Sequence, residues 1–93
     1  MDRLFSLGGK VAIVTGGNGG IGKGIAEGLA EAGANLVIAA RKPEKIEKAV
    51  DEIKAKFGVP VRGIAGDLTQ ENQIRRMVSQ TLESFGRIDI LVN

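Results

Sequence analysis

The chain has 93 residues, enough for one small domain, and 43% of them are hydrophobic, so it can bury a core. No apolar run approaches the roughly 20 residues that span a bilayer, so we expect no membrane partner. The formal net charge of +2 is neither clustered nor interleaved with aromatic residues, so we expect no nucleic-acid partner either.

The N-terminal segment does not have the basic-then-apolar order of a signal peptide, because Gly8, Gly9 and Lys10 interrupt it. The chain also contains no Cys, and disulfides are typical of exported proteins. We therefore expect a cytoplasmic protein.

Short apolar runs alternate with helical patterns along the rest of the chain. Apolar runs predict buried strands at 10–15, 36–40, 61–65 and 88–92. Apolar residues at helical spacing predict helices over 20–32, over 43–57 and from about Ile74 to Phe85. In the first of these helices, Ile21, Ile25 and Leu29 recur every four residues, with Ala26 and Ala32 beside them, and together they form one apolar face.

This alternation predicts an α/β fold with a parallel sheet between layers of helices. Right-handed crossovers give the strand order 3-2-1-4, with the first two helices on one face and the third on the other. One helix would then cover four apolar strands on the second face, and the strand at 88–92 would form an open apolar edge. We therefore expect residues 1–93 to be the N-terminal part of a single domain, truncated after its fourth strand.

A glycine-rich turn joins the first strand to the first helix. In such a turn Gly16, Gly20 and Gly22 would permit the sharp reversal, the close approach of a pyrophosphate, and tight packing of helix on strand. The helix N-terminus would then offer its backbone N–H groups and its dipole to the phosphates. The alternative, that the glycines only permit a tight turn and a close helix crossing, stays open.

The same turn is close to a P-loop, the phosphate site of nucleoside triphosphatases. The run from Gly17 to Lys23 has the spacing G-x-x-x-x-G-K, but Gly24 stands where a Ser or Thr hydroxyl would bind Mg²⁺. We therefore expect Lys23 to be a surface residue of the first helical turn.

The end of the second strand indicates which dinucleotide would bind. An NAD-binding fold usually places Asp or Glu there, about 20 residues beyond the glycines, to bind the ribose 2′-hydroxyl. No acidic residue lies between Asn35 and Pro43, and Arg41 and Lys42 follow the strand instead. An Arg pairs with a 2′-phosphate, so the sequence predicts NADP, with NAD less favoured. Alternatively, these two side chains are ordinary exposed residues before a helix.

Four stretches together resemble the short-chain dehydrogenase/reductase family over the entire chain. They are Thr15-Gly16-x-x-x-Gly20-Ile21-Gly22, Gly66-Asp67-Leu68, the run from Gly86 to Asn93, and the lead-in from Leu4 to Lys10. The lead-in is most similar to that of gluconate dehydrogenases and 3-oxoacyl-carrier-protein reductases. The resemblance implies a Rossmann-type three-layer fold, a nicotinamide dinucleotide partner and hydride transfer to or from an alcohol or ketone.

By this resemblance, Asp67 contacts the adenine, and Asn93 begins the Asn-Asn-Ala-Gly motif of the family. From the residues alone, Asp67 could instead initiate the next helix, with Thr69 as an alternative cap. The predicted cofactor-binding residues are Gly16, Asn18, Gly19, Gly20, Ile21, Gly22, Arg41, Lys42, Asp67, Leu68 and Asn93.

The family reduces its substrates with a Ser and a Tyr-x-x-x-Lys unit beyond that motif, and this chain contains no Tyr. We assign no catalytic residue and no metal ligand to it, and we expect it to be inactive alone, as part of a longer enzyme that is a homo-oligomer. A non-catalytic dinucleotide-binding or redox-sensing module is the alternative if the chain is complete. An adenosylmethionine-dependent methyltransferase is less favoured, because Arg41 stands where a ribose diol usually meets an acid.

Overall fold

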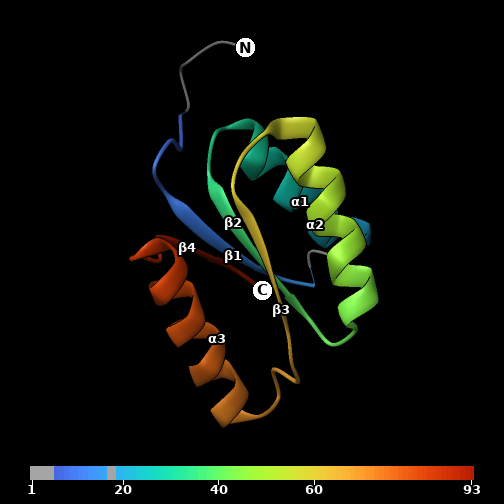
Figure 1. Ribbon diagram of the computed structural model, residues 1–93, viewed down its shortest axis with the longest axis vertical. Helices are drawn as coiled ribbons and strands as arrows, with labels where there is room; N and C mark the ends of the chain where they lie inside the picture. The colour runs from blue at the N-terminus through green and yellow to red at the C-terminus, as the bar shows by residue number, and fades with distance from the viewer. Residues whose placement is uncertain (1–5, 17–18) are drawn as a thin grey trace.

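The computed structural model describes residues 6–16 and 19–93, which alternate between strands and helices (Figure 1). The elements are β1 (Val11–Thr15), α1 (Gly20–Glu31), β2 (Asn35–Ala40), α2 (Pro43–Phe57), β3 (Val61–Ala65), α3 (Glu71–Phe85) and β4 (Ile90–Val92). The strands pair in parallel in the order β3-β2-β1-β4, as predicted. Within the described residues, no helix has the length and apolar character that crossing a membrane requires.

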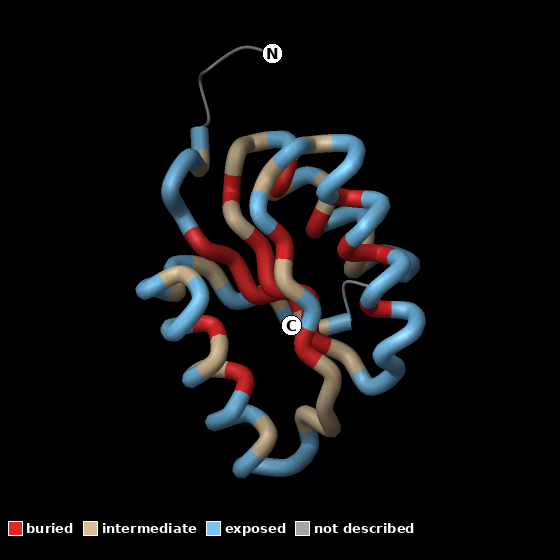
Figure 2. Tube along the Cα trace, viewed as in Figure 1, coloured by how far each residue is buried: buried red, intermediate tan, exposed pale blue. Residues whose placement is uncertain are grey.

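The sheet separates two apolar cores, which confirms the predicted three layers. Because side chains alternate across a strand, Ala12 and Val14 pack under α1 and α2, whereas Ile13 packs under α3 with Met77. Figure 1 shows α1 and α2 on one side of the sheet and α3 on the other. In Figure 2 the buried residues follow the central strands β1 and β2 between these helices.

The apolar face predicted for α1 is buried only in part. Ile21 is 84% exposed and Ile25 is 40% exposed, whereas Ala26 and Ala30 are buried against the sheet. Leu29 does pack partly against this core. The small alanine side chains let the backbone of the helix approach the sheet closely, so the alanine face turns inward and the isoleucine face turns outward.

The edge strand β4 begins at Ile90, two residues later than predicted. The preceding residue, Asp89, pairs with both backbone groups of Val11: its N–H donates to the carbonyl oxygen of Val11, and its Oδ2 accepts from the N–H of Val11, each over 2.9 Å. A side-chain carboxylate here takes the place of a strand carbonyl, which delays the start of the ladder. Strand β4 lies at the edge of the sheet, as predicted, and Leu91 on it is 61% exposed.

Gly63 in β3 lies under the buried face of α2. A Cβ atom at this position would overlap Cγ2 of Ile46 and lie 3.3 Å from Cγ2 of Val50. Both isoleucine and valine are stiff at χ1, and both of these side chains are buried. The close approach of α2 to the sheet therefore depends on a glycine in β3.

Replacing Gly63 with Ala should lower the free energy of unfolding by about 1–3 kcal/mol, the usual cost of an overpacked core. The matched control is Gly28→Ala in α1, where a Cβ has no atom within 4 Å. That change should raise stability, because Ala is favoured over Gly in a helix by about 1 kcal/mol. Chemical denaturation measures both, and equal stability of the two variants would contradict the packing argument.

Candidate functional site

The predicted site residues gather at the edge of the sheet where β1, β2 and β3 end. The parallel ladder continues one residue past these strands: the N–H of Gly16 donates to the carbonyl of Ala39, and the N–H of Gly66 donates to that of Ala40, each over 2.8 Å. Gly16, Arg41 and Asp67 therefore leave the sheet side by side. In open α/β sheets, ligands bind outside this carboxyl edge.

The glycine-rich turn has the backbone conformation that only glycine adopts easily. Gly16 has φ +72° and Gly20 has φ +57°, in the left-handed region that a side chain disfavours. Gly19 is the N-cap of α1, and the first turn of this helix, which includes Ile21 and Gly22, carries no acidic residue within the described part of the chain. The first turn of α1 therefore places no carboxylate of its own beside these amides. Asn18 lies outside the described residues.

Lys23 lies in the first turn of α1, as predicted, and forms an ion pair at the surface. Its ammonium group pairs with the carboxylate of Glu52 on α2, and its side chain is 28% exposed. The hydrogen bond raises the pKa of Lys23 and lowers that of Glu52. Lys23 therefore links α1 to α2, and both partners line a hollow with Gly19 and Gly20 of the glycine turn.

A cavity of about 390 Å³ opens at the carboxyl edge, a size in the range of small-molecule sites. Its floor is formed by the small residues at the end of β2, and its rim carries the charged side chains of Arg41 and Asp67. The lining residues are Gly16, Ala39, Ala40, Arg41, Gly66, Asp67, Leu68 and Thr69. A shallow apolar floor with a charged rim suits a flat heterocycle that carries a polar sugar.

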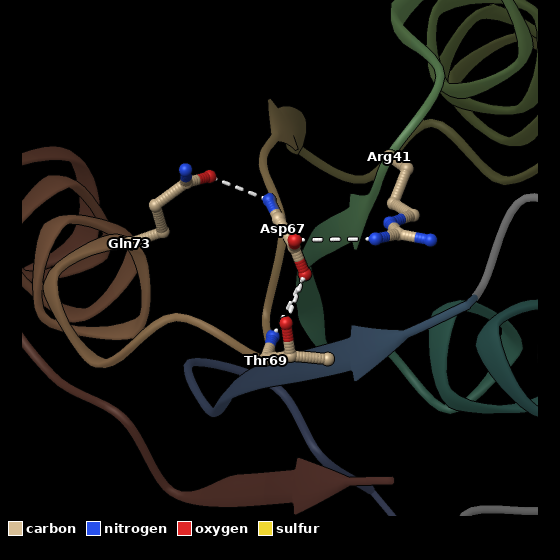
Figure 3. A network of polar contacts seen from close by, with 4 residues as sticks. All are labelled: Arg41, Asp67, Thr69 and Gln73. Carbon is tan, nitrogen blue, oxygen red and sulfur yellow. Dashed lines mark hydrogen bonds and ion pairs between the residues drawn. The ribbon is translucent and has the colours of Figure 1, made fainter.

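Asp67 is the centre of a polar network at this rim (Figure 3). Its Oδ1 accepts hydrogen bonds from the N–H and the hydroxyl of Thr69, at 3.0 and 2.6 Å. Its Oδ2 accepts from Nη2 of Arg41 at 3.1 Å, and its own N–H donates to Oε1 of Gln73. The hydrogen bonds from Thr69, followed by that from Arg41, lower the pKa of Asp67 to about 2.

The expectation that Asp67 or Thr69 initiates the next helix is wrong. Helix α3 begins at Glu71 with Gln70 as its N-cap, and no side chain caps it. The carboxylate of Asp67 instead closes a turn between β3 and α3, because it accepts from the residue two positions later.

Arg41 and Lys42 both follow β2, in different surroundings. The side chain of Arg41 is 73% exposed and forms an ion pair with Asp67. Lys42 is the exposed N-cap of α2. The sequence did not predict that two of its candidate residues would pair with each other across the mouth of the cavity.

A second cavity, of about 220 Å³, extends the carboxyl edge toward β4. It is lined by Thr15, Leu68, Ile74, Met77, Leu91 and Asn93. The hydroxyl of Thr15 donates to the carbonyl of Val92 at 3.1 Å and to Oδ1 of Asn93 at 3.3 Å. Leu68 lines both cavities, so the two cavities adjoin. The predicted residues Arg41, Leu68 and Asn93 therefore lie along one continuous edge.

The sequence reasoning did not assign Thr15, Thr69 or Gln73 to the site. The spacing Asp67-x-Thr69 is a recognisable signal, because Asp often accepts a hydrogen bond from the backbone two residues later. No comparable short-range pattern indicates Gln73, whose amide reaches Asp67 from the first turn of α3.

A family described as "short chain dehydrogenase" matches residues 10–93. Dehydrogenase/reductase SDR family member 4 from Caenorhabditis elegans is 44% identical over 85 residues, which cover 91% of this chain and 33% of that protein. The chain thus spans about a third of the length of this curated relative.

Two solved structures have nearly the same fold. L-sorbose reductase from Gluconobacter frateurii, complexed with NADPH and L-sorbose, is 42% identical with a TM-score of 0.92, covering 100% of this chain and 35% of that one. RhlG from Pseudomonas aeruginosa, complexed with NADP, is 43% identical with a TM-score of 0.90, covering 100% and 36%.

Replacing Thr69 with Val should raise the pKa of Asp67 from about 2 toward its ordinary value, because the largest cause of the shift is the Thr69 hydroxyl. Folding lowers the pKa of the Asp67 carboxyl. The charged carboxylate therefore stabilises the folded state at pH values above the pKa of the unfolded chain, and this stabilisation is lost as the pH falls toward 2. Carbon-detected NMR titration of the carboxyl groups measures the change. Asp89, whose low pKa depends on Arg87, is the internal control, and an unmoved Asp67 would contradict the assignment.

Proposed function

This chain belongs to the short-chain dehydrogenase family, and from that premise we propose that it is the NADP-binding portion of a longer oxidoreductase. The enzyme would transfer hydride between NADP(H) and an alcohol or ketone. One observation carries the proposal. The glycine turn, Arg41 and Asp67 lie together around one cavity at the carboxyl edge of the sheet.

The pyrophosphate would lie over the turn from Gly16 to Gly22. The left-handed conformations of Gly16 and Gly20 keep side chains away from the path of the phosphates. The N-terminus of α1 supplies N–H donors and a positive dipole end, to which an anion is attracted. Gly19 belongs to this contact by its place in the turn, and from the sequence Asn18 would reach the 2′-phosphate.

The adenosine would occupy the cavity between β2 and β3. Ala39 and Ala40 form a floor that a flat ring can cover, and Leu68 borders it. At the rim, Arg41 stands where an NAD-binding fold usually has an acid, and its guanidinium matches a 2′-phosphate. Lys42, next to it, adds positive charge. The similar structures with bound NADPH and NADP agree with this preference.

The chain's own part in catalysis would be to hold and orient the cofactor. Bound NADP(H) would supply or accept the hydride. Asn93, at the end of β4, would lie on the nicotinamide side of the edge, fixed by Thr15. We assign no acid, base or nucleophile to this chain, and the catalytic Ser, Tyr and Lys of the family would belong to the rest of the enzyme. The lead-in similar to 3-oxoacyl-carrier-protein reductases and gluconate dehydrogenases supports a substrate with an oxo or hydroxyl group.

NADPH should bind more tightly than NADH, and Arg41→Ala should remove most of the difference. Loss of a charged hydrogen-bonding group opposite the 2′-phosphate is expected to weaken NADPH binding roughly 10- to 100-fold, with NADH binding unchanged. Isothermal titration calorimetry at fixed ionic strength measures both affinities.

The matched control is Arg75→Ala, which removes the same charge from an exposed ion pair on α3. It should leave both affinities unchanged. NADH binding as tight as NADPH binding by the unsubstituted protein would overturn the NADP assignment.

A further inference from the structure

The carboxylate of Asp67 is held in place without help from Arg41. Oδ1 accepts two hydrogen bonds from Thr69, and the backbone of Asp67 is fixed on both sides, by Gln73 at its N–H and by the N–H of Gln70 at its carbonyl. The turn between β3 and α3 therefore determines where the other oxygen, Oδ2, which meets Arg41, points (Figure 3).

Arg41 has no comparable support from its own strand. Its side chain extends from the end of β2, is 73% exposed, and meets Oδ2 of Asp67 through Nη2. Long side chains such as Arg lose much rotamer freedom when they are ordered, so an untethered Arg41 would sample many positions. The contact occupies one arm of the guanidinium fork and leaves other N–H groups for a second acceptor.

We propose that Asp67 is a positioning residue that holds the guanidinium of Arg41 over the adenosine cavity, and thereby sets the preference for nucleotides with a 2′-phosphate. This inference rests on the proposed function. A tethered Arg41 binds the phosphate without first being ordered, and preorganisation of this kind raises affinity. The charge of Asp67 would also repel a phosphate, but Arg41 pairs with Asp67 and would neutralise much of that charge, and solvent screens charges at this exposed rim.

A double-mutant cycle with Asp67→Asn and Arg41→Ala tests the inference. NADPH and NADH are the probes, together with adenosine 2′,5′-bisphosphate and 5′-AMP, which differ only in the 2′-phosphate. Asp67→Asn keeps the size of the side chain and removes its charge. It should lower the preference for the 2′-phosphate roughly 2- to 10-fold, the effect of freeing one side chain. In the Arg41→Ala background the same change should have no effect on that preference.

Thr69→Val provides a second variant, in which the charge of Asp67 remains and one of its anchors is lost. It should lower the preference in the same direction by a smaller factor. Circular dichroism confirms that each variant is folded, and a general loss of structure would weaken all four probes alike instead of shifting their ratio.

Three results would overturn the inference. The first is tighter NADPH binding by Asp67→Asn, which would make Asp67 a competitor of the phosphate. The second is an equal effect of Asp67→Asn with and without Arg41, which would mean that Asp67 acts on the nucleotide directly. The third is a preference lost in Arg41→Ala but kept in Asp67→Asn. If the unsubstituted protein binds none of the four probes, the proposed function fails, and the inference fails with it.

Discussion

Parallel pairing of β2 with both β1 and β3 brings residues far apart in the sequence to one edge of the sheet. Thr15 is in register with Ala39, and Ala40 is in register with Ala65. Each strand therefore ends at the same level, and the chain leaves the sheet there three times. The glycine turn, Arg41 and the Asp67 turn meet only because of this register. A shift of one residue would also reverse which side chains face each core.

The scaffold and the site have different physical requirements at this edge. Ala12, Val14 and Leu36 are fully buried in the core, where close packing fixes the strands. The residues just past the strands are held instead by polar contacts and by glycine conformations, such as the left-handed Gly16. Arg41 is exposed, so its side chain can move to admit a ligand. It is also directed by the carboxylate of Asp67, which Thr69 holds in place.

Most of the fold followed from sequence patterns, because periodicity and turn residues are local signals. The strand order and the three layers are examples, whereas the place of the site stays a prediction. Periodicity gives the spacing of apolar residues but does not determine which part of an apolar face turns inward, so it did not indicate that Ala26 would be buried while Ile21 and Ile25 are exposed. The start of β4 was missed because the side chain of Asp89 imitates a backbone acceptor. The pairing of Arg41 with Asp67 joins residues 26 positions apart and depends on the register of two strands.

The central claim, that the carboxyl edge of this sheet binds a dinucleotide, is tested most directly by mapping amide chemical shifts during titration with NADPH. The account predicts that the perturbed amides cluster at Gly16, at Arg41 and from Gly66 to Thr69, at the ends of β1, β2 and β3. Perturbations centred on the opposite edge, near Lys10 and Ala34, or the absence of any saturable change, would contradict it.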